Sequence, residues 1–289
     1  MTRARATAIG FAAVLLWALL ALLTVGTAPV PPFLLNALTF GIGGLAGLGW
    51  IAATGGWSRL RKVPPAALAF GTAGLFGYHA LYFSALRLAP AAEASLIAYL
   101  WPLFIVLLSG VLPGEPLRRG HVLGALVAFA GAALIVLGRQ QGDAWGPGAA
   151  LGLGLAFLCA LTWAAYSVGS RWFGAVPTEA VALFCLATAA LSLPCHLMWE
   201  TTAWPDGGAG WAAVLALGLG PVGLAFYVWD IGMKQGDIRL LGVAAYAAPL
   251  LSTQALVLAG MAPVSWVLGV AAALIAGGAL LAARSGGKG

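Results

Sequence analysis

The sequence predicts an all-α integral membrane protein in which ten transmembrane helices form two inverted five-helix repeats around a central cavity. Three observations support this prediction. Only 8% of the 289 residues are charged, against about a quarter in soluble domains, so the chain could not coat a surface that faces water. Long apolar segments follow one another along the whole chain, and its two halves share tyrosine and proline at one spacing.

The apolar segments are long enough to be membrane-spanning helices. Each reaches the roughly 20 residues that a helix needs to cross about 30 Å of hydrocarbon. Backbone groups in lipid must bond within their own segment, which favours helices over strands here. The first segment resembles a signal peptide, but its long apolar run and its internal counterpart lead us to expect a retained span. The ten segments lie near residues 7–26, 32–54, 66–86, 92–112, 119–138, 148–171, 178–199, 211–233, 240–260 and 264–283.

Lysine and arginine predict the direction of insertion. With the N-terminus in the cytoplasm, only Arg87 and Arg139 lie outside, and the other basic residues lie inside. We therefore expect a multi-pass protein of a bacterial-type inner membrane with both termini in the cytoplasm. The basic residues are scattered through short loops without a basic arm, which argues against a nucleic-acid partner and leaves the lipid bilayer as the surroundings.

An internal repeat divides the chain near its middle. Residues 83–103 read FSALRLAPAAEASLIAYLWPL and residues 230–250 read DIGMKQGDIRLLGVAAYAAPL, so an offset of 147 pairs Tyr99 with Tyr246 and Pro102 with Pro249. We expect the first repeat over residues 1–143 and the second over residues 144–289, within one membrane domain. Because five helices are an odd number, the second repeat must enter the membrane from the opposite side, as in many secondary transporters.

The same region carries a resemblance to a known family. The run ALRLAPAAEASLIAYLWPLFIVLL, followed by GEPLRRGHVLGALVAFAGAALIVLG, resembles the EamA repeat of the drug/metabolite transporter superfamily. The tyrosines of the third segment make the chain similar to the YddG-type aromatic amino acid exporters. The resemblance implies a ten-helix inner-membrane exporter with a cavity between the repeats. The chain departs from the pattern at Asn36, where the family often has arginine, and at Ala262, where the first repeat has Glu115, so no role for a charge is carried over to these positions.

The third segment contains an unusual group of polar rings. Within FGYHALYFSALRLAP, residues 76–90, the side chains of Tyr78, His79 and Tyr82 share one arc of the helix close to its midpoint. Polar groups at this depth are costly unless they face protein or water, which makes them functional candidates. The alternative is a buried imidazole whose partner lies on a neighbouring helix.

Further aromatic residues at helical spacing extend the candidate site. Tyr99 and Trp101 are about 200° apart, so an ideal helix cannot aim both inward, although Pro102 could bend it. For Trp17, Trp163, Tyr166 and Trp229, packing and site lining fit the pattern equally well. The predicted substrate-binding residues are His79, Tyr78, Tyr82, Tyr99, Trp101, Trp17, Trp163, Tyr166 and Tyr246.

The absence of charge at mid-depth limits the substrate. A cavity lined by rings suits a zwitterion with a ring, or a large organic cation held by cation–π contacts. We expect an exporter of small aromatic or amphipathic metabolites, foremost aromatic amino acids, that works by alternating access. The alternatives are a multidrug or organic-cation exporter of the same superfamily and, from another class, a membrane channel or assembly subunit. Both proton-coupled export through His79 and passive export remain open.

Catalytic and metal chemistry find little support. No nucleophile with a base is grouped at mid-depth, so we do not expect an enzyme. The three histidines fall on different segments, and we expect no metal and no cofactor. The three cysteines have no paired spacing, and we expect them to be buried free thiols. The sequence leaves the oligomeric state open, and a monomer is compatible with it.

Overall fold

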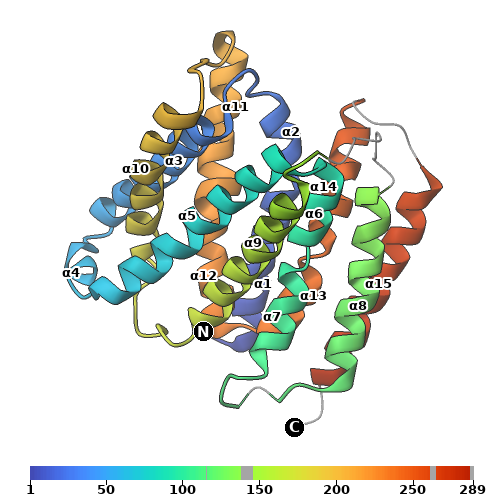
Figure 1. Ribbon diagram of the computed structural model, residues 1–289. Helices are drawn as coiled ribbons and strands as arrows, with labels where there is room; N and C mark the ends of the chain where they lie inside the picture. The colour runs from blue at the N-terminus through green and yellow to red at the C-terminus, as the bar shows by residue number, and fades with distance from the viewer. Residues whose placement is uncertain (115, 138–145, 261–264, 287–289) are drawn as a thin grey trace.

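Helices account for every regular element in the part of the chain that the structure describes (Figure 1). The computed structural model describes residues 1–114, 116–137, 146–260 and 265–286. Glu115, Arg139, Ala262 and the expected boundary after residue 143 lie outside these ranges. The helices are α1 (Arg3–Ala18), α2 (Leu20–Val25), α3 (Pro32–Ala53), α4 (Trp57–Leu60), α5 (Pro65–Leu88), α6 (Ala91–Ala98), α7 (Trp101–Ser109), α8 (Arg119–Leu137), α9 (Ala149–Gly169), α10 (Ala180–Trp199), α11 (Gly207–Leu219), the π-helix η1 (Gly220–Leu224), α12 (Ala225–Gln235), α13 (Ile238–Ala244), α14 (Ala247–Leu258) and α15 (Trp266–Gly286).

Many of these helices could cross a membrane. By length and composition, eight described stretches are long and apolar enough, and Glu93–Ser109 is a shorter apolar helix. Helix α5 is not among the eight, although it has 24 residues, and it carries the polar rings of the third segment. The prediction of an all-helical protein with multiple apolar spans is confirmed. The eight stretches are Arg3–Val25, Pro32–Ala53, Arg119–Leu137, Ala149–Gly169, Ala180–Trp199, Gly207–Gln235, Ile238–Leu258 and Trp266–Ser285.

Four of the expected helices are interrupted near their middle. Breaks at Leu19, at Tyr99–Leu100 and at Ala245–Tyr246 separate α1 from α2, α6 from α7 and α13 from α14, and η1 separates α11 from α12. Pro102 and Pro249 follow two of these breaks. Because proline has no N–H, it cannot bond the carbonyl four residues earlier, and its ring clashes with that carbonyl. The two proline-linked breaks lie at equivalent positions of the repeat.

The most extensive helix contacts join the two halves of the chain. Helix α8 packs on α15, α3 on α10, α5 on α9 and α1 on α12. Figure 1 shows the first two pairs at opposite sides of the molecule, with the other two pairs between them. If every span is replaced by its counterpart in the other half, the pairs α8–α15 and α3–α10 stay the same. The pairs α5–α9 and α1–α12 change places, so the same four pairs are recovered. The pairing is therefore the one that two related halves would make.

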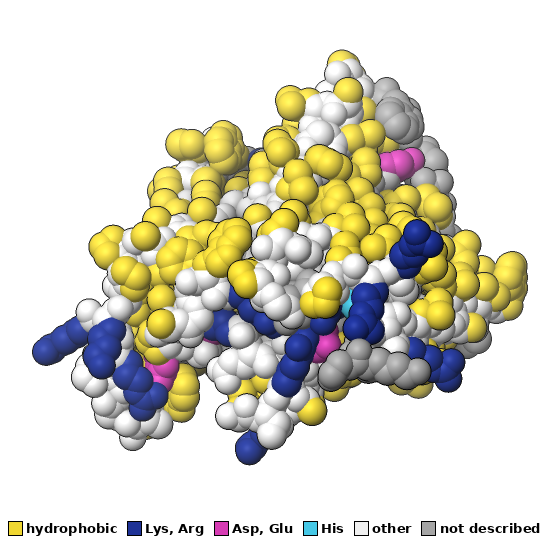
Figure 2. All heavy atoms as spheres, turned by 90° about the horizontal axis from the view of Figure 1, so that it is seen from below, with side chains coloured by type: hydrophobic (Ala, Val, Ile, Leu, Met, Phe, Trp, Pro, Cys, Tyr) yellow, Lys and Arg dark blue, Asp and Glu magenta, His cyan; other side chains and the backbone are white. Residues whose placement is uncertain are grey.

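The surface of the molecule is divided into apolar sides and a basic end. Large apolar side chains are exposed on many helices, for example Leu197 on α10 and Leu258 on α14. Lysine and arginine gather on the face that is seen from below in Figure 2, and the N-terminus and the last turn of α15 lie towards that side in Figure 1. The sides therefore suit lipid and the basic end suits water and phospholipid headgroups.

Candidate functional site

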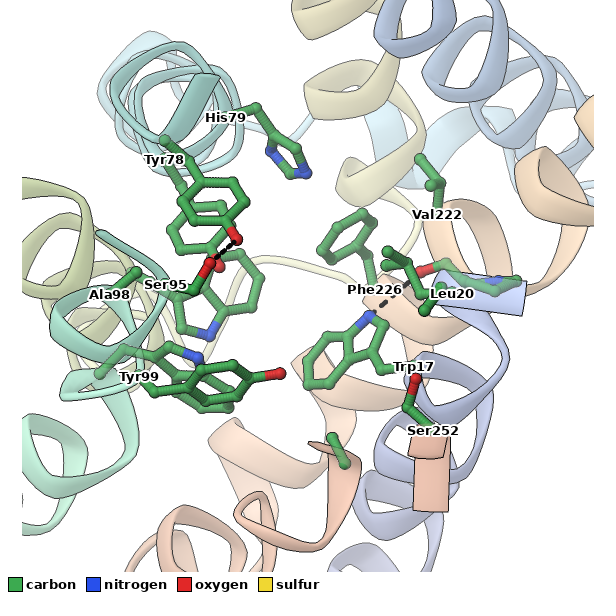
Figure 3. Close-up of a pocket in the computed structure, with 16 residues that line it drawn as sticks. Trp17, Leu20, Tyr78, His79, Ser95, Ala98, Tyr99, Val222, Phe226 and Ser252 are labelled. Atoms are coloured by element: carbon green, nitrogen blue, oxygen red, sulfur yellow. Dashed lines mark hydrogen bonds between the residues drawn. The ribbon is translucent and has the colours of Figure 1, made fainter. Parts of the chain in front are cut away.

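A cavity of about 190 Å³ lies between the two halves of the chain. Figure 3 shows side chains from both halves pointing into it, and none of the 16 lining residues is charged. Helices α2, α6 and α14, which lie above α1, α7 and α13 in Figure 1, contribute Leu20, Ser95 and Ser252 to its lining, so the cavity extends towards the side opposite the basic end. The lining residues are Trp17, Leu20, Ala21, Tyr78, His79, Tyr82, Ser95, Ala98, Tyr99, Trp101, Trp163, Pro221, Val222, Phe226, Ala248 and Ser252.

Four tryptophans form one cluster at the cavity. The ring centroids of Trp17, Trp101, Trp163 and Trp229 lie 5.0 to 6.4 Å apart in every pairing. Two of the indole N–H groups have partners, because Trp229 Nε1 donates to Ser167 Oγ at 3.1 Å and Trp17 Nε1 donates to Pro221 O at 3.1 Å. Three of the four rings, those of Trp17, Trp101 and Trp163, line the cavity, and the cluster forms its aromatic floor.

The π-helix η1 explains how Trp17 finds its acceptor. In an α-helix, Pro221 O would accept from the N–H of Ala225. Here the Ala225 N–H bonds Gly220 O instead, as the wider turn requires. The carbonyl of Pro221 is therefore left for the indole from the other half of the chain. One local irregularity thus fixes a ring that lines the cavity.

Helix α5 supplies the polar wall of the cavity. Tyr78 and Tyr82 stack with ring centroids 6.1 Å apart, and the Tyr82 hydroxyl is 2.9 Å from Ser95 Oγ. His79 Nδ1 lies 2.7 Å from Leu75 O. Because a carbonyl oxygen only accepts, Nδ1 must carry a proton, and Nε2 of a neutral ring is then an acceptor. Figure 3 shows the ring of His79 directed into the cavity.

The break between α6 and α7 brings two rings to one cavity. An uninterrupted helix would separate Tyr99 and Trp101 by about 200°. The chain instead leaves α6 at Ala98 and starts α7 at Trp101, so both residues line the cavity. The break lies just before Pro102, the residue that the sequence analysis named as able to bend this helix.

Two of the predicted site residues, Tyr166 and Tyr246, do not line the cavity. Tyr166 is buried between Phe70 and Trp163, on the face of α9 that packs against α5. Tyr246 is fully buried, and its hydroxyl accepts from the N–H of Leu103 at 3.1 Å. Helical spacing alone could not separate these tyrosines from the lining rings, because it does not show which face meets a neighbouring helix.

Comparison with known proteins assigns the chain to a family. The model of the EamA-like transporter family matches twice, over residues 5–137 and 150–284. The chain belongs to the EamA-like transporter family. Its members of known name that match here are exporters and transporters and not enzymes.

Individual relatives cover nearly the whole chain. An aromatic amino acid exporter YddG of Ancylobacter novellus is 57% identical over 98% of this chain and 98% of its own length. The aromatic amino acid exporter YddG of Escherichia coli is 27% identical over 97% of both chains. A protein of known crystal structure, 56% identical, matches 98% of this chain and 99% of its own with a TM-score of 0.93.

The EamA-like repeat also points to a lining residue, Phe226, that helical spacing missed. The offset of 147 that relates the two repeats carries His79 to Phe226 and Tyr82 to Trp229. Phe226 lines the cavity with its ring centroid 6.3 Å from that of His79, and Trp229 lies in the floor. Small lining residues such as Ser95, Ala248 and Ser252 carry no such signal, because their place depends on the breaks in the helices.

Proposed function

We propose that this chain is a ten-span transporter that exports aromatic amino acids by alternating access. The two repeats, over residues 1–143 and 144–289, would be inserted in opposite directions in an inner membrane, with both termini in the cytoplasm. The pairing of helices across the two halves supports the repeat, and the basic end near the termini supports the orientation. In this arrangement α5 and the α6–α7 pair are membrane spans in addition to the eight stretches that meet the criterion by composition.

The observation that carries the proposal is an uncharged, ring-lined cavity of about 190 Å³. Pockets for drug-sized ligands measure roughly 300 to 1,000 Å³, so this cavity suits one molecule of amino-acid size. The named relatives at 57% and 27% identity are aromatic amino acid exporters, which supports the same substrate class. A substrate with a net charge would find no lining side chain of opposite charge.

The polar groups suggest how the substrate is oriented. The aromatic ring would stack on Trp17 and Trp163 near the floor. Neutral His79 offers Nε2 as an acceptor, which suits the ammonium of the substrate. The carboxylate would take a hydrogen bond from the hydroxyl of Tyr99, which points towards Trp17 in Figure 3. All nine predicted residues therefore remain candidates, with Tyr166 and Tyr246 acting from outside the cavity in this state.

Counterflow in proteoliposomes tests the proposal. Liposomes loaded with unlabelled phenylalanine should accumulate labelled phenylalanine, and tyrosine and tryptophan should compete while leucine competes weakly. Trp163→Ala removes a stacking surface and should raise the half-saturating concentration about tenfold or more, whereas Trp172→Ala, an exposed ring outside the cavity, serves as the matched control.

The same assay separates the alternatives. Saturable exchange of a quaternary ammonium compound, with no competition by phenylalanine, would favour the organic-cation exporter. Flux that does not saturate would favour a channel. Absence of any exchange that depends on the protein would contradict the transport proposal. An imposed pH gradient then distinguishes coupled from passive export.

A further inference from the structure

The two broken helices of the repeats, α6–α7 and α13–α14, are equivalent in sequence but differ in their packing. Below the cavity α7 packs on α13, where a Cβ at Gly242 would lie 3.2 Å from Pro102 O. Above, the equivalent halves α6 and α14 stand on different walls of the cavity, with Ser95 on α6 and Ser252 on α14. Gly242 on α13 and Ser95 on α6 are equivalent positions, 147 residues apart. The crossing of α7 and α13 is therefore closely packed, or closed, whereas the equivalent crossing of α14 and α6 is separated by the cavity, or open.

The two tyrosines of the repeat differ in the same way. At the closed crossing, the hydroxyl of Tyr246 accepts from the N–H of Leu103 at 3.1 Å. This N–H belongs to the first turn of α7, where no intrahelical partner is available, so Tyr246 caps the helix of the other repeat. The equivalent cap would join Tyr99 to Leu250. Tyr99 instead lines the cavity, with its hydroxyl pointing towards Trp17 (Figure 3).

We propose that Tyr99 and Tyr246 exchange these roles when the transporter turns over. In the state that opens towards the termini, Tyr246 leaves the N–H of Leu103 and faces the substrate, while Tyr99 caps α14 at Leu250. The inference rests on the proposed alternating access between inverted repeats, because such repeats can exchange their conformations. One tyrosine hydroxyl then faces the substrate in each state, and the other holds the closed crossing.

The exchange explains why Tyr246 is fully buried although its counterpart in the first repeat, Tyr99, lines the cavity. If the hydroxyl of Tyr246 served only to hold α7 in place, the first repeat would not need a tyrosine at the equivalent position, residue 99. Loss of one hydrogen bond changes an equilibrium by about three- to tenfold. Removing each hydroxyl should therefore shift the balance between the two states, and the two shifts should have opposite signs.

Cysteine accessibility measures this balance without relying on transport. In a variant without the native cysteines, the reporters Ser252→Cys and Ile105→Cys lie at equivalent positions of the two repeats. Ser252 lines the open cavity, and Ile105 is fully buried below it. We expect Ile105→Cys to react with a maleimide reagent only in the opposite state. The ratio of the two labelling rates therefore follows the ratio of the two states.

The tyrosine variants give the decisive comparison. Tyr246→Phe should raise the labelling of Ile105→Cys about three- to tenfold and lower that of Ser252→Cys. Tyr99→Phe should lower the labelling of Ile105→Cys by a similar factor. The double variant should return the rate to within about twofold of the parent. Shifts of the same sign, or no shift with Tyr99→Phe, would overturn the exchange.

The controls separate the two proposals. If Tyr246→Phe yields no folded protein, Tyr99→Phe alone decides, because unchanged or raised labelling of Ile105→Cys overturns the inference. Opposite shifts in a protein that shows no phenylalanine counterflow would support the exchange and contradict the proposed substrate. Counterflow with shifts of the same sign would support the proposed function and overturn the exchange.

Discussion

The buried ion pair of Asp230 and Lys234 should contribute strongly to the free energy of unfolding. Lys234 Nζ lies 2.9 Å from Asp230 Oδ1, and the two side chains are only 5% and 2% exposed. Thr178 donates to the other carboxylate oxygen at 2.7 Å, and Lys234 also donates to Val176 O at 2.9 Å. The pair thus joins α12 to the segment between α9 and α10.

Asp230→Asn keeps the shape of the side chain and leaves the ammonium of Lys234 without its counter-ion. Removing one partner of a buried pair costs about 3–5 kcal/mol, whereas replacing both partners costs much less. We therefore expect a loss of about 3–5 kcal/mol for Asp230→Asn, and recovery of at least about 2 kcal/mol when Lys234→Met is added. Denaturant unfolding in detergent micelles, followed by tryptophan fluorescence, measures both values.

A more exposed pair provides the control. Arg3 Nη2 lies 3.3 Å from Asp237 Oδ2, but the side chains are 49% and 25% exposed. Pairs of this kind contribute about 1 kcal/mol or less, so Arg3→Met should change the free energy of unfolding little. If Asp230→Asn costs no more than Arg3→Met, or if adding Lys234→Met makes the loss larger, the reasoning from burial is refuted.

Three further predictions concern packing, capping and thiol access. A methyl group at Gly232 would lie 2.5 Å from the backbone of α1, so Gly232→Ala should destabilise the protein by about 1–3 kcal/mol in the same unfolding assay. The control is Gly269→Ala, which should not destabilise the protein because a methyl group there has no atom within 4 Å. Glu200 accepts from two backbone N–H groups at the start of α3 and pairs with an arginine of α5. Glu200→Gln should therefore lower the free energy of unfolding by about 1–3 kcal/mol. The control Asp206→Asn, at an exposed position, should lower it by less than about 0.5 kcal/mol. The three cysteines are free and buried, as expected from the sequence, so a maleimide reagent should label them only after unfolding, and mass spectrometry would detect any labelling of the native protein.

The sequence predicted the class of fold because that class depends on composition. Low charge, the length of the apolar segments and the repeat offset are all properties of the chain itself. The breaks in the helices were harder to predict. Pro102, Pro221 and Pro249 mark three of them, but the break at Leu19 has no proline beside it. Their place depends on how the halves meet around the cavity.

The candidate site was predicted in part for a related reason. The arc of Tyr78, His79 and Tyr82 on α5 does line the cavity, because a helix without a break keeps its faces in register. Tyr166 and Tyr246 carry the same residue type at the same kind of spacing and lie elsewhere. Only the neighbouring helix decides whether a ring faces a cavity or a packed surface, and that information is absent from a single helix.

The placement of charge supports a neutral substrate more strongly than the rings do. Buried carboxylates exist in this protein, but they are neutralised away from the cavity: Asp230 by Lys234 near one end, and Glu200 by Arg87 and the start of α3 near the other. A charged group in the cavity would lack such partners, and isolated buried charge is costly. A zwitterion needs only one acceptor for its ammonium and one donor for its carboxylate, and Nε2 of His79 and the hydroxyl of Tyr99 offer these. An organic cation would rely on the faces of the lining rings, which Tyr99→Phe preserves, so this change should weaken phenylalanine exchange more than any cation exchange.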